Sequence, residues 1–284
     1  MLQEKVATPR LEFGESTTPY AAYAGIDTLH SLLRPRTDAA AERSFIVATQ
    51  VMELLFGQLR FEWTRAQQAL RADDLTEATA ALRRGLGVQD VLAGSWDILG
   101  TLTPNEFNSF RGALGEASGF QSYTYLHLEF LVGNKSAAVL KLYAAVPDVL
   151  KELTETLNAP SLYDDVLGVL RRRGLPVPPT PAPGSAPDAD SDSAHTKAYA
   201  SQPEVEQAWR IVYTDESHHD LMLLGELMLD VAERVSRWRQ RHLTIVKRCM
   251  GAKPGTGGSS GLHWLRKAAE QDVFPELWTV RNEL

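Results

Sequence analysis

One histidine lies on the apolar face of the longest helical pattern in the sequence. Within residues 217–249, positions spaced by three or four share one helical face: Leu221, Leu224, Met228, Val231, Val235, Trp238, His242, Ile245 and Cys249. A buried imidazole must be hydrogen-bonded or must coordinate a metal. His242 is therefore either a hydrogen-bonded core residue, the commoner case, or a ligand. The other six histidines are not spaced to complete a zinc site with it, whereas a single imidazole facing an apolar space can hold heme iron.

A glycine-rich segment follows this helical pattern directly, with five glycines among residues 251–261. It lacks the Gly-Lys-Ser/Thr of a P-loop and the third glycine of GxGxxG, and it follows a helix where a nucleotide loop follows a strand. Two interpretations stay open. The segment is a flexible surface linker, or it is a loop whose main chain and Thr256 hydroxyl close over a small ligand.

An arginine lies among aromatic residues near the middle of the chain. Arg111 follows Phe107 and Phe110 and precedes Leu114, on a short stretch of helical spacing. It is either a surface residue whose stem packs on apolar neighbours or a bidentate clamp for a carboxylate in an aromatic pocket.

The composition excludes several classes of protein. The chain has 284 residues, 44% of them hydrophobic, with 29 Lys+Arg against 36 Asp+Glu and a net charge of −7. It can bury a large core and has no broad positive surface, so we expect no nucleic-acid partner. Cys249 is the only cysteine, which excludes an internal disulfide and a Cys-rich metal site. No signal-peptide core or run of about 18 apolar residues occurs, so we expect a cytoplasmic protein without a membrane partner.

Helical periodicity dominates the elements that must position these residues. It predicts one long helix over 38–71, a second opened by the capping-box spacing of Asp74 and Glu77, and a short third one begun by Thr103-Pro104-Asn105-Glu106. Further helices are predicted near 120–132, 136–145, 147–157, 161–173 and 205–213. With strand signals nearly absent, the predicted fold class is all-α, a helical bundle enclosing a ligand pocket.

The domain organisation follows from a change in composition. Residues 174–203 are rich in Pro, Asp and Ser and predict a disordered linker insertion. We expect residues 1–17 to form an N-terminal arm, and residues 18–173 and 204–284 to form two parts of one helical domain. Pattern alone leaves open two independent domains separated by the insertion.

Four segments resemble the tryptophan 2,3-dioxygenase family of cytosolic heme enzymes. They are residues 45–54, residues 102–111, residues 118–122, and Arg241-His242 running on to residues 255–261. The similarity extends from about Thr18 to Leu284 and is interrupted at the insertion. The resemblance implies heme b with ferrous iron, L-tryptophan or a close indole amino-acid analogue, O₂, and a homotetramer. It also implies a place in tryptophan catabolism, at the kynurenine pathway.

The resemblance also implies roles for individual residues around the heme. His242 matches the axial ligand of the iron, which leaves the opposite iron face for O₂. Trp96 matches an aromatic residue that orients the imidazole, and Ser118 matches a polar residue near the heme edge.

The substrate residues implied by the resemblance are Phe45, Phe107, Leu114, Arg111, Thr256, Tyr20 and Tyr23. In this match Arg111 pairs with the substrate carboxylate and Thr256 binds the amino-acid head group as the glycine loop closes. Phe45 and Leu114 form walls of the indole pocket. Tyr20 and Tyr23 match tyrosines that reach into the site of a neighbouring subunit.

Two positions depart from the family pattern. Thr49 stands where well-studied members have a distal histidine, and Phe107 stands where many have tyrosine. Threonine cannot take a proton near neutral pH, so no acid or base catalyst is assigned. We expect cleavage of the indole C2–C3 bond to N-formylkynurenine. The alternatives are monooxygenation of tryptophan or β-methyltryptophan to a 2-oxindole in secondary metabolism, and a heme sensor without turnover.

Overall fold

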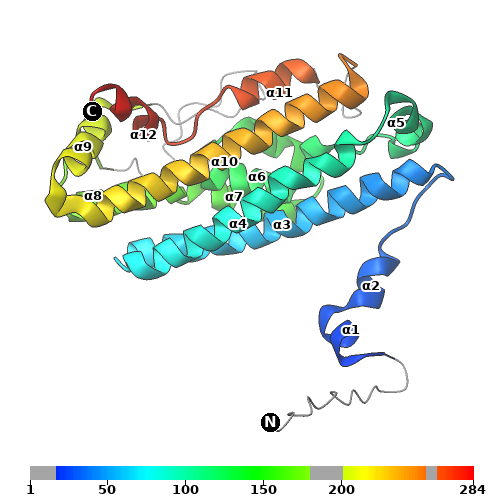
Figure 1. The fold of residues 1–284 in the computed structure, drawn as a ribbon, viewed down its shortest axis with the longest axis horizontal. Helices are drawn as coiled ribbons and strands as arrows, with labels where there is room; N and C mark the ends of the chain where they lie inside the picture. The colour runs from blue at the N-terminus through cyan, green and yellow to red at the C-terminus, as the bar shows by residue number, and fades with distance from the viewer. Residues whose placement is uncertain (1–16, 180–200, 254–260) are drawn as a thin grey trace, which may run out of the picture.

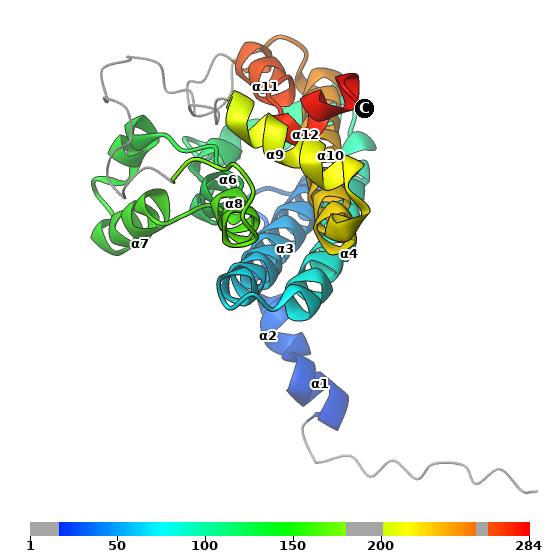
Figure 2. The ribbon, with the colours of Figure 1, turned by 90° about the vertical axis from the view of Figure 1, so that its left-hand side faces the viewer.

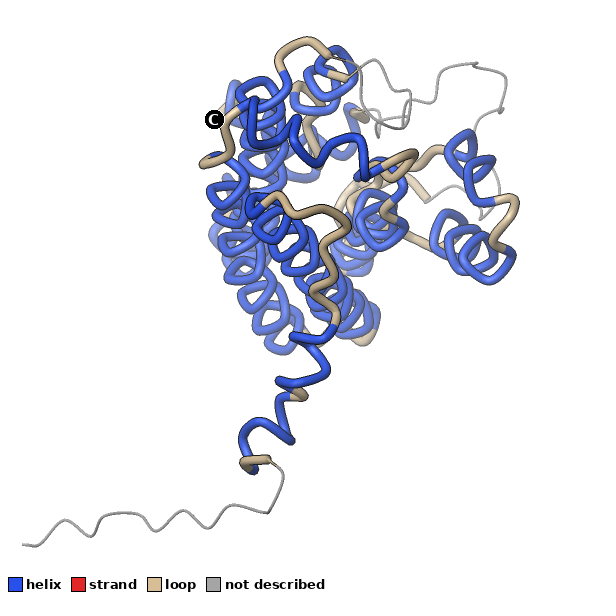
Figure 3. Tube along the Cα trace, turned by 90° about the vertical axis from the view of Figure 1, so that its right-hand side faces the viewer, coloured by secondary structure: helices blue, strands red, loops and turns tan. Residues whose placement is uncertain are grey.

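Three long helices form the framework of the protein in a computed structural model. They are α3 (Ala40–Arg71), α4 (Leu75–Gly100) and α10 (His219–Met250), and α4 packs against both of the others (Figure 1). The structure describes residues 17–179, 201–253 and 261–284. All regular elements in these ranges are helices, joined by loops (Figure 3). The predicted all-α fold is confirmed.

Local capping begins the helices where the sequence predicted. The Asp74 side chain accepts a hydrogen bond of 3.0 Å from the Glu77 N–H at the start of α4. Helix α5 (Pro104–Arg111) begins with a complete capping box, in which the Glu106 carboxylate accepts from the Thr103 N–H at 2.8 Å. Each cap satisfies backbone donors that the first helical turn leaves unpaired.

The middle of the chain forms a second group of helices. These are α6 (Tyr123–Leu131), α7 (Pro147–Asn158) and α8 (Leu162–Arg172). The predicted helix over 136–145 is a 3₁₀ helix over Ala137–Tyr143, because only a short segment separates the Gly133 turn from Pro147 and 3₁₀ winding suits short pieces. The predicted helix at 120–132 begins later, at Tyr123, since Ser122 accepts from the Tyr125 N–H and caps it there.

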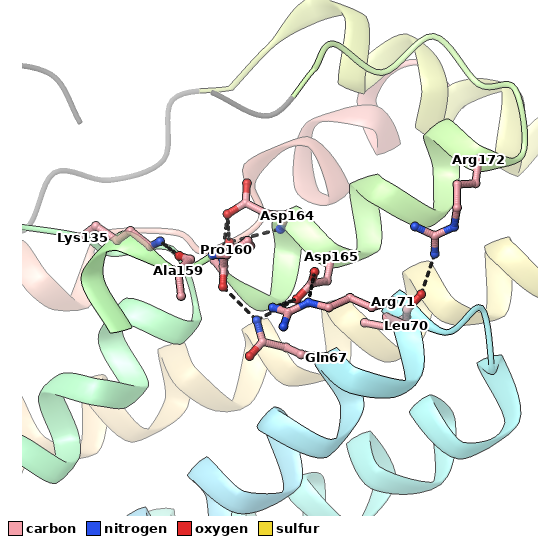
Figure 4. A network of polar contacts seen from close by, with 10 residues as sticks. Gln67, Leu70, Arg71, Lys135, Ala159, Pro160, Asp164, Asp165 and Arg172 are labelled. Carbon is pink, nitrogen blue, oxygen red and sulfur yellow. Dashed lines mark hydrogen bonds and ion pairs between the residues drawn. The ribbon is translucent and has the colours of Figure 1, made fainter. Parts of the chain in front are cut away.

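A polar cluster in which Gln67 and Asp165 are buried and Arg71 is exposed fastens α8 to the C-terminal half of α3 (Figure 4). Arg71 donates two hydrogen bonds of 2.8 Å to Asp165, and Gln67 donates to Asp165 at 2.8 Å and to the Pro160 carbonyl at 2.9 Å. Burial raises the pKa of Asp165, and the hydrogen bonds and charge of Arg71 oppose this shift. The pair is therefore stabilising only while both partners are present.

Helices α9 (Pro203–Thr214), α11 (Leu262–Ala269) and α12 (Pro275–Thr279) complete the fold. The buried apolar residues of α9 and α12 belong to the same hydrophobic core as those of α3, α4 and α8, and α11 packs against α10. Leu175 and Val177 lie inside the predicted insertion, yet both are buried in this core. The packed chain therefore extends to at least Val177. Residues 180–200 lie outside the described ranges, and the domain boundaries stay a prediction.

The N-terminal helices project from the rest of the protein (Figures 1 and 2). Helices α1 (Pro19–Ala24) and α2 (Ile26–Ser31) contain no buried residue. Their base is held by Gln50, which donates to the Leu32 carbonyl at 3.0 Å, and by the buried Glu42, which accepts from the backbone of Arg36 and Thr37. Within the described ranges, no helix combines the length and the apolar character needed to cross a membrane.

Candidate functional site

The apolar face of α10 is open at one point. Near its N-terminal and C-terminal ends the predicted face is fully buried, but Val235, Trp238 and His242 are only partly buried. The apolar face of α10 is therefore packed throughout except between Val235 and His242, where the described elements cover it only in part. The sequence pattern predicted a continuous seam, so the opening at His242 is a feature of the structure alone.

Aromatic rings surround the His242 imidazole on the side of α4 and α10. The Trp96 ring stacks on it with centroids 4.3 Å apart and planes 17° apart. Trp238, one helical turn earlier on α10, meets it edge-on at 5.4 Å and 62°. Trp238 in turn stacks on Tyr125 of α6 at 4.9 Å and contacts Phe56 of α3. Rings from two helices thus fix the orientation of the imidazole, and the rings of Tyr125 and Phe56 support Trp238.

The protonation state of His242 suits a metal ligand. Desolvation by the surrounding groups lowers its pKa to about 4, so the ring is neutral at neutral pH and keeps a nitrogen lone pair. Within residues 17–179, 201–253 and 261–284 the imidazole has no hydrogen-bond partner. A hydrogen-bonded core histidine is therefore not what the structure contains. In the same ranges no group of three or more His, Cys, Asp or Glu side chains could hold a metal ion.

The Phe45 and Thr49 side chains lie on α3, near its N-terminal end. Phe45 packs against Phe107 and Phe110 of α5, with centroid distances of 6.1 and 5.4 Å. Thr49 is exposed, and its hydroxyl donates a hydrogen bond of 2.9 Å to the Phe45 carbonyl one turn earlier. The donor proton of Thr49 is therefore engaged by its own helix.

Helix α5 carries the candidate carboxylate clamp to the same end of the bundle. It packs against both α3 and α10, at the end where α4 finishes (Figure 1). Arg111 is partly buried in its last turn, and Leu114 in the following 3₁₀ turn packs on the core. Ser118 caps the next 3₁₀ turn, where its hydroxyl accepts from the Phe120 N–H. The structure therefore brings α3, α4, α5 and α10 together around the predicted site.

Three predicted residues are not placed at the site within one chain. Thr256 lies outside the described residues, as does most of the glycine loop. Tyr20 and Tyr23 lie on the projecting helix α1 and are 74% and 95% exposed, with no contact to the core of their own chain. Their assignment to a neighbouring subunit stays a prediction.

A small cavity lies beside the aromatic rings, between α3, α4, α6 and α10. Its volume is about 40 Å³, and its lining includes Trp63, Gln89, Tyr125, Glu129 and Trp238. It has room for a few water molecules but for neither a porphyrin nor an amino acid. The carbonyl oxygen of the buried Gln89 side chain has no hydrogen-bond partner among the described residues.

Comparison with known proteins identifies the family. The sequence profile described as tryptophan 2,3-dioxygenase matches residues 4–173 and 190–284. The chain belongs to the tryptophan 2,3-dioxygenase family. Three relatives named tryptophan 2,3-dioxygenase come from Polaromonas sp. (38% identical over 97% of this chain and 90% of the relative), Pseudomonas fluorescens (39%, over 97% and 94%) and Caulobacter vibrioides (38%, over 93% and 98%). The predicted resemblance is confirmed.

Membership of the tryptophan 2,3-dioxygenase family gives the geometry a context. Residues 174–189, which the family profile does not match, lie within the predicted insertion. Sequence reasoning counted Trp238 only as a core residue and overlooked Tyr125. The signal for Trp238 was its position four residues before His242, which places both on one face of a helix. Nothing local in the sequence indicated that Tyr125 would stack on it.

Proposed function

We propose that this chain is a heme-dependent dioxygenase that cleaves the indole C2–C3 bond of L-tryptophan with O₂ and forms N-formylkynurenine. The observation that carries the proposal is the His242 imidazole, which is neutral, without a hydrogen-bond partner in the described part of the chain, and stacked on Trp96 at the opening of the α10 face. These properties fit a single axial ligand of heme iron. Family membership supports the reaction class and the substrate.

In this proposal His242 holds the heme, Trp96 and Trp238 orient the imidazole, and Ser118 lies near the heme edge. When bound, heme supplies the redox-active iron that the reaction with O₂ requires. The chain itself binds and orients the amino acid and keeps water from the indole.

The substrate residues divide into polar and apolar groups. The Arg111 guanidinium pairs with the substrate carboxylate, and Thr256 in the glycine loop binds the head group. Phe45, Phe107 and Leu114 hold the indole by apolar contact. With the head group fixed, positioning of the ring relative to the iron supplies much of the rate enhancement.

Thr49 has no part in proton transfer in this proposal. Its hydroxyl donates to the Phe45 carbonyl and has no accessible pKa near neutrality, so it cannot serve as a base. The indole must therefore react without a protein base at this position.

The exposed tyrosines of α1 support the assembly that the family resemblance implies. Tyr20 and Tyr23 would complete the site of a neighbouring subunit in a cytoplasmic homotetramer. Both side chains are largely exposed in the single chain, which makes them accessible to a second copy.

The decisive experiment is the mass of the product formed from L-tryptophan by reduced, heme-loaded protein under ¹⁸O₂. Gain of two labelled oxygen atoms is expected. Gain of one would instead support the 2-oxindole alternative, for which Thr49 is the motivating residue. Absence of tryptophan consumption would favour a heme sensor. A His242→Ala preparation serves as the control for product that arises from free heme.

A further inference from the structure

Helix α6 holds α10 at the two residues that lie one turn before His242. The Tyr125 ring stacks on Trp238 with centroids 4.9 Å apart and planes 28° apart. One turn later on α6, Glu129 forms an ion pair with Arg239, the residue next to Trp238, at 2.7 Å between Nη2 and Oε2. A single turn of α6 therefore fixes both the ring that touches His242 and the backbone that carries it.

The ion pair is enclosed and has an extensive hydrogen-bond network. The Arg239 and Glu129 side chains are only 4% and 12% exposed. The Tyr125 hydroxyl donates to one Glu129 oxygen, and the Asn134 amide donates to the other at 2.8 Å. Arg239 also donates to the Gln271 carbonyl at 2.9 Å. Both Glu129 oxygens and both terminal nitrogens of the Arg239 guanidinium thus have partners, as a buried pair requires, whereas Arg239 Nε has none among the described residues.

The Glu129 and Arg239 charges compensate each other within one helical turn of His242. Arg239 precedes His242 by three residues, so both lie on adjacent turns of α10. In a poorly solvated region, a single uncompensated charge acts over a much longer range than it does in water. Reduction of a bound iron removes one unit of positive charge from the site. A lone positive charge nearby therefore favours the reduced state, and a lone negative charge favours the oxidised state.

We propose that Glu129 and Arg239 are positioning residues that hold Trp238 against the His242 imidazole and, as a compensated pair, set the reduction potential of the iron that His242 binds. This proposal rests on the proposed function only in requiring that His242 ligates heme. It assigns a functional role to a network formed between α6, α10 and the Gln271 segment.

The test compares the heme reduction potentials of four variants in the full chain. Glu129→Gln keeps the shape of the side chain and removes its charge, so the potential should shift upward. Arg239→Gln should shift it downward. The double variant should return it toward the wild-type value, because neither charge is then left uncompensated. Asp97→Asn is the matched control, since it removes one carboxylate from an ion pair with Arg241, beside His242, that is exposed to water.

Each outcome decides the proposal. Shifts of opposite sign that cancel in the double variant support it, provided that the shift in Asp97→Asn is much smaller. Shifts of the same sign, no shifts, or an equal shift in the control would overturn it. If a single variant does not fold, Arg239→Lys and the double variant decide the proposal. Both must keep a reduction potential near that of the wild type. In addition, Arg239→Lys must change the near-ultraviolet circular dichroism of the heme-free chain.

Failure of this proposal and failure of the proposed function are distinguishable. Opposite shifts without formation of N-formylkynurenine would leave the role of the pair standing and refute the activity. Normal formation of N-formylkynurenine with unshifted reduction potentials would leave the activity standing and refute the role of the pair. A wild-type chain that takes up no heme would overturn both.

Discussion

The stacking of Trp96 on His242 should measurably slow the loss of heme. The rings are 4.3 Å apart and nearly parallel, and Trp96 is 7% exposed, so the contact restricts the imidazole to one orientation. A stacked aromatic pair contributes about 0.5–1.5 kcal/mol beyond its buried area. Since 1.4 kcal/mol corresponds to tenfold in an equilibrium constant, Trp96→Leu should weaken heme binding by roughly two- to tenfold.

Trp96→Phe is the matched control because it keeps an aromatic face. The Trp96 indole N–H has no hydrogen-bond partner among the residues that the structure describes, so replacement by phenylalanine loses no hydrogen bond. Heme transfer to an excess of apomyoglobin measures the dissociation rate, and chemical unfolding of the heme-free chain measures the separate cost of the smaller core residue. The argument fails if the leucine variant releases heme as slowly as wild type, or if the phenylalanine variant releases it as fast as the leucine variant.

Three further predictions test other parts of the protein. His242→Ala should purify without the Soret absorption of bound heme, whereas the exposed His219→Ala on the same helix should keep it; a full heme complement in His242→Ala would show that another residue is the ligand. Arg111→Ala should weaken L-tryptophan binding by about 2–5 kcal/mol, and an unchanged KM would show that the clamp lies elsewhere. Burial, assisted by the charge of Arg60, lowers the pKa of His127 from 6.5 to about 4. Between pH 6.5 and 4 the unfolded chain therefore binds more protons at His127 than the folded chain does. Acidification over this range should lower the free energy of unfolding of the heme-free chain by about 3 kcal/mol. A His127→Gln variant whose stability depends on pH as the wild type does would refute this prediction.

The fold was predictable wherever its signals are local. The capping box of Thr103 and Glu106 and the cap of Asp74 each involve residues three apart, and the structure contains each where the sequence predicted it. The periodicity of α3 and α10 located both helices to within two residues. Helical spacing did not separate a 3₁₀ helix from an α-helix over Ala137–Tyr143, because so short a segment samples both periods.

The proximal part of the site was only half predictable for a related reason. Periodicity shows which residues share a face but not what the face meets. His242 was therefore correctly placed on the face, whereas its contact with Trp96 joins residues far apart in the sequence. The pair of Glu129 and Arg239 spans 110 positions. A charged residue on a helix gives no sequence signal that distinguishes a buried ion pair from an exposed one.

Thr49 illustrates how structure alters the meaning of a departure from a family pattern. Thr49 could have supplied a polar group at the pocket wall, but a threonine on a helix can bond the carbonyl one turn earlier, and here it does. Under the proposed function, this wall therefore contributes shape and apolar contact, while the polar recognition of substrate comes from Arg111 and the glycine loop. If the proposed role of Glu129 and Arg239 holds, control of charge comes from this buried pair, which lies beside Trp238 and thus one ring away from His242. Under both proposals, substitutions at Glu129 and Arg239 should change the reduction potential of the bound iron, while L-tryptophan binding, which is assigned to Arg111 and the glycine loop, should stay unchanged.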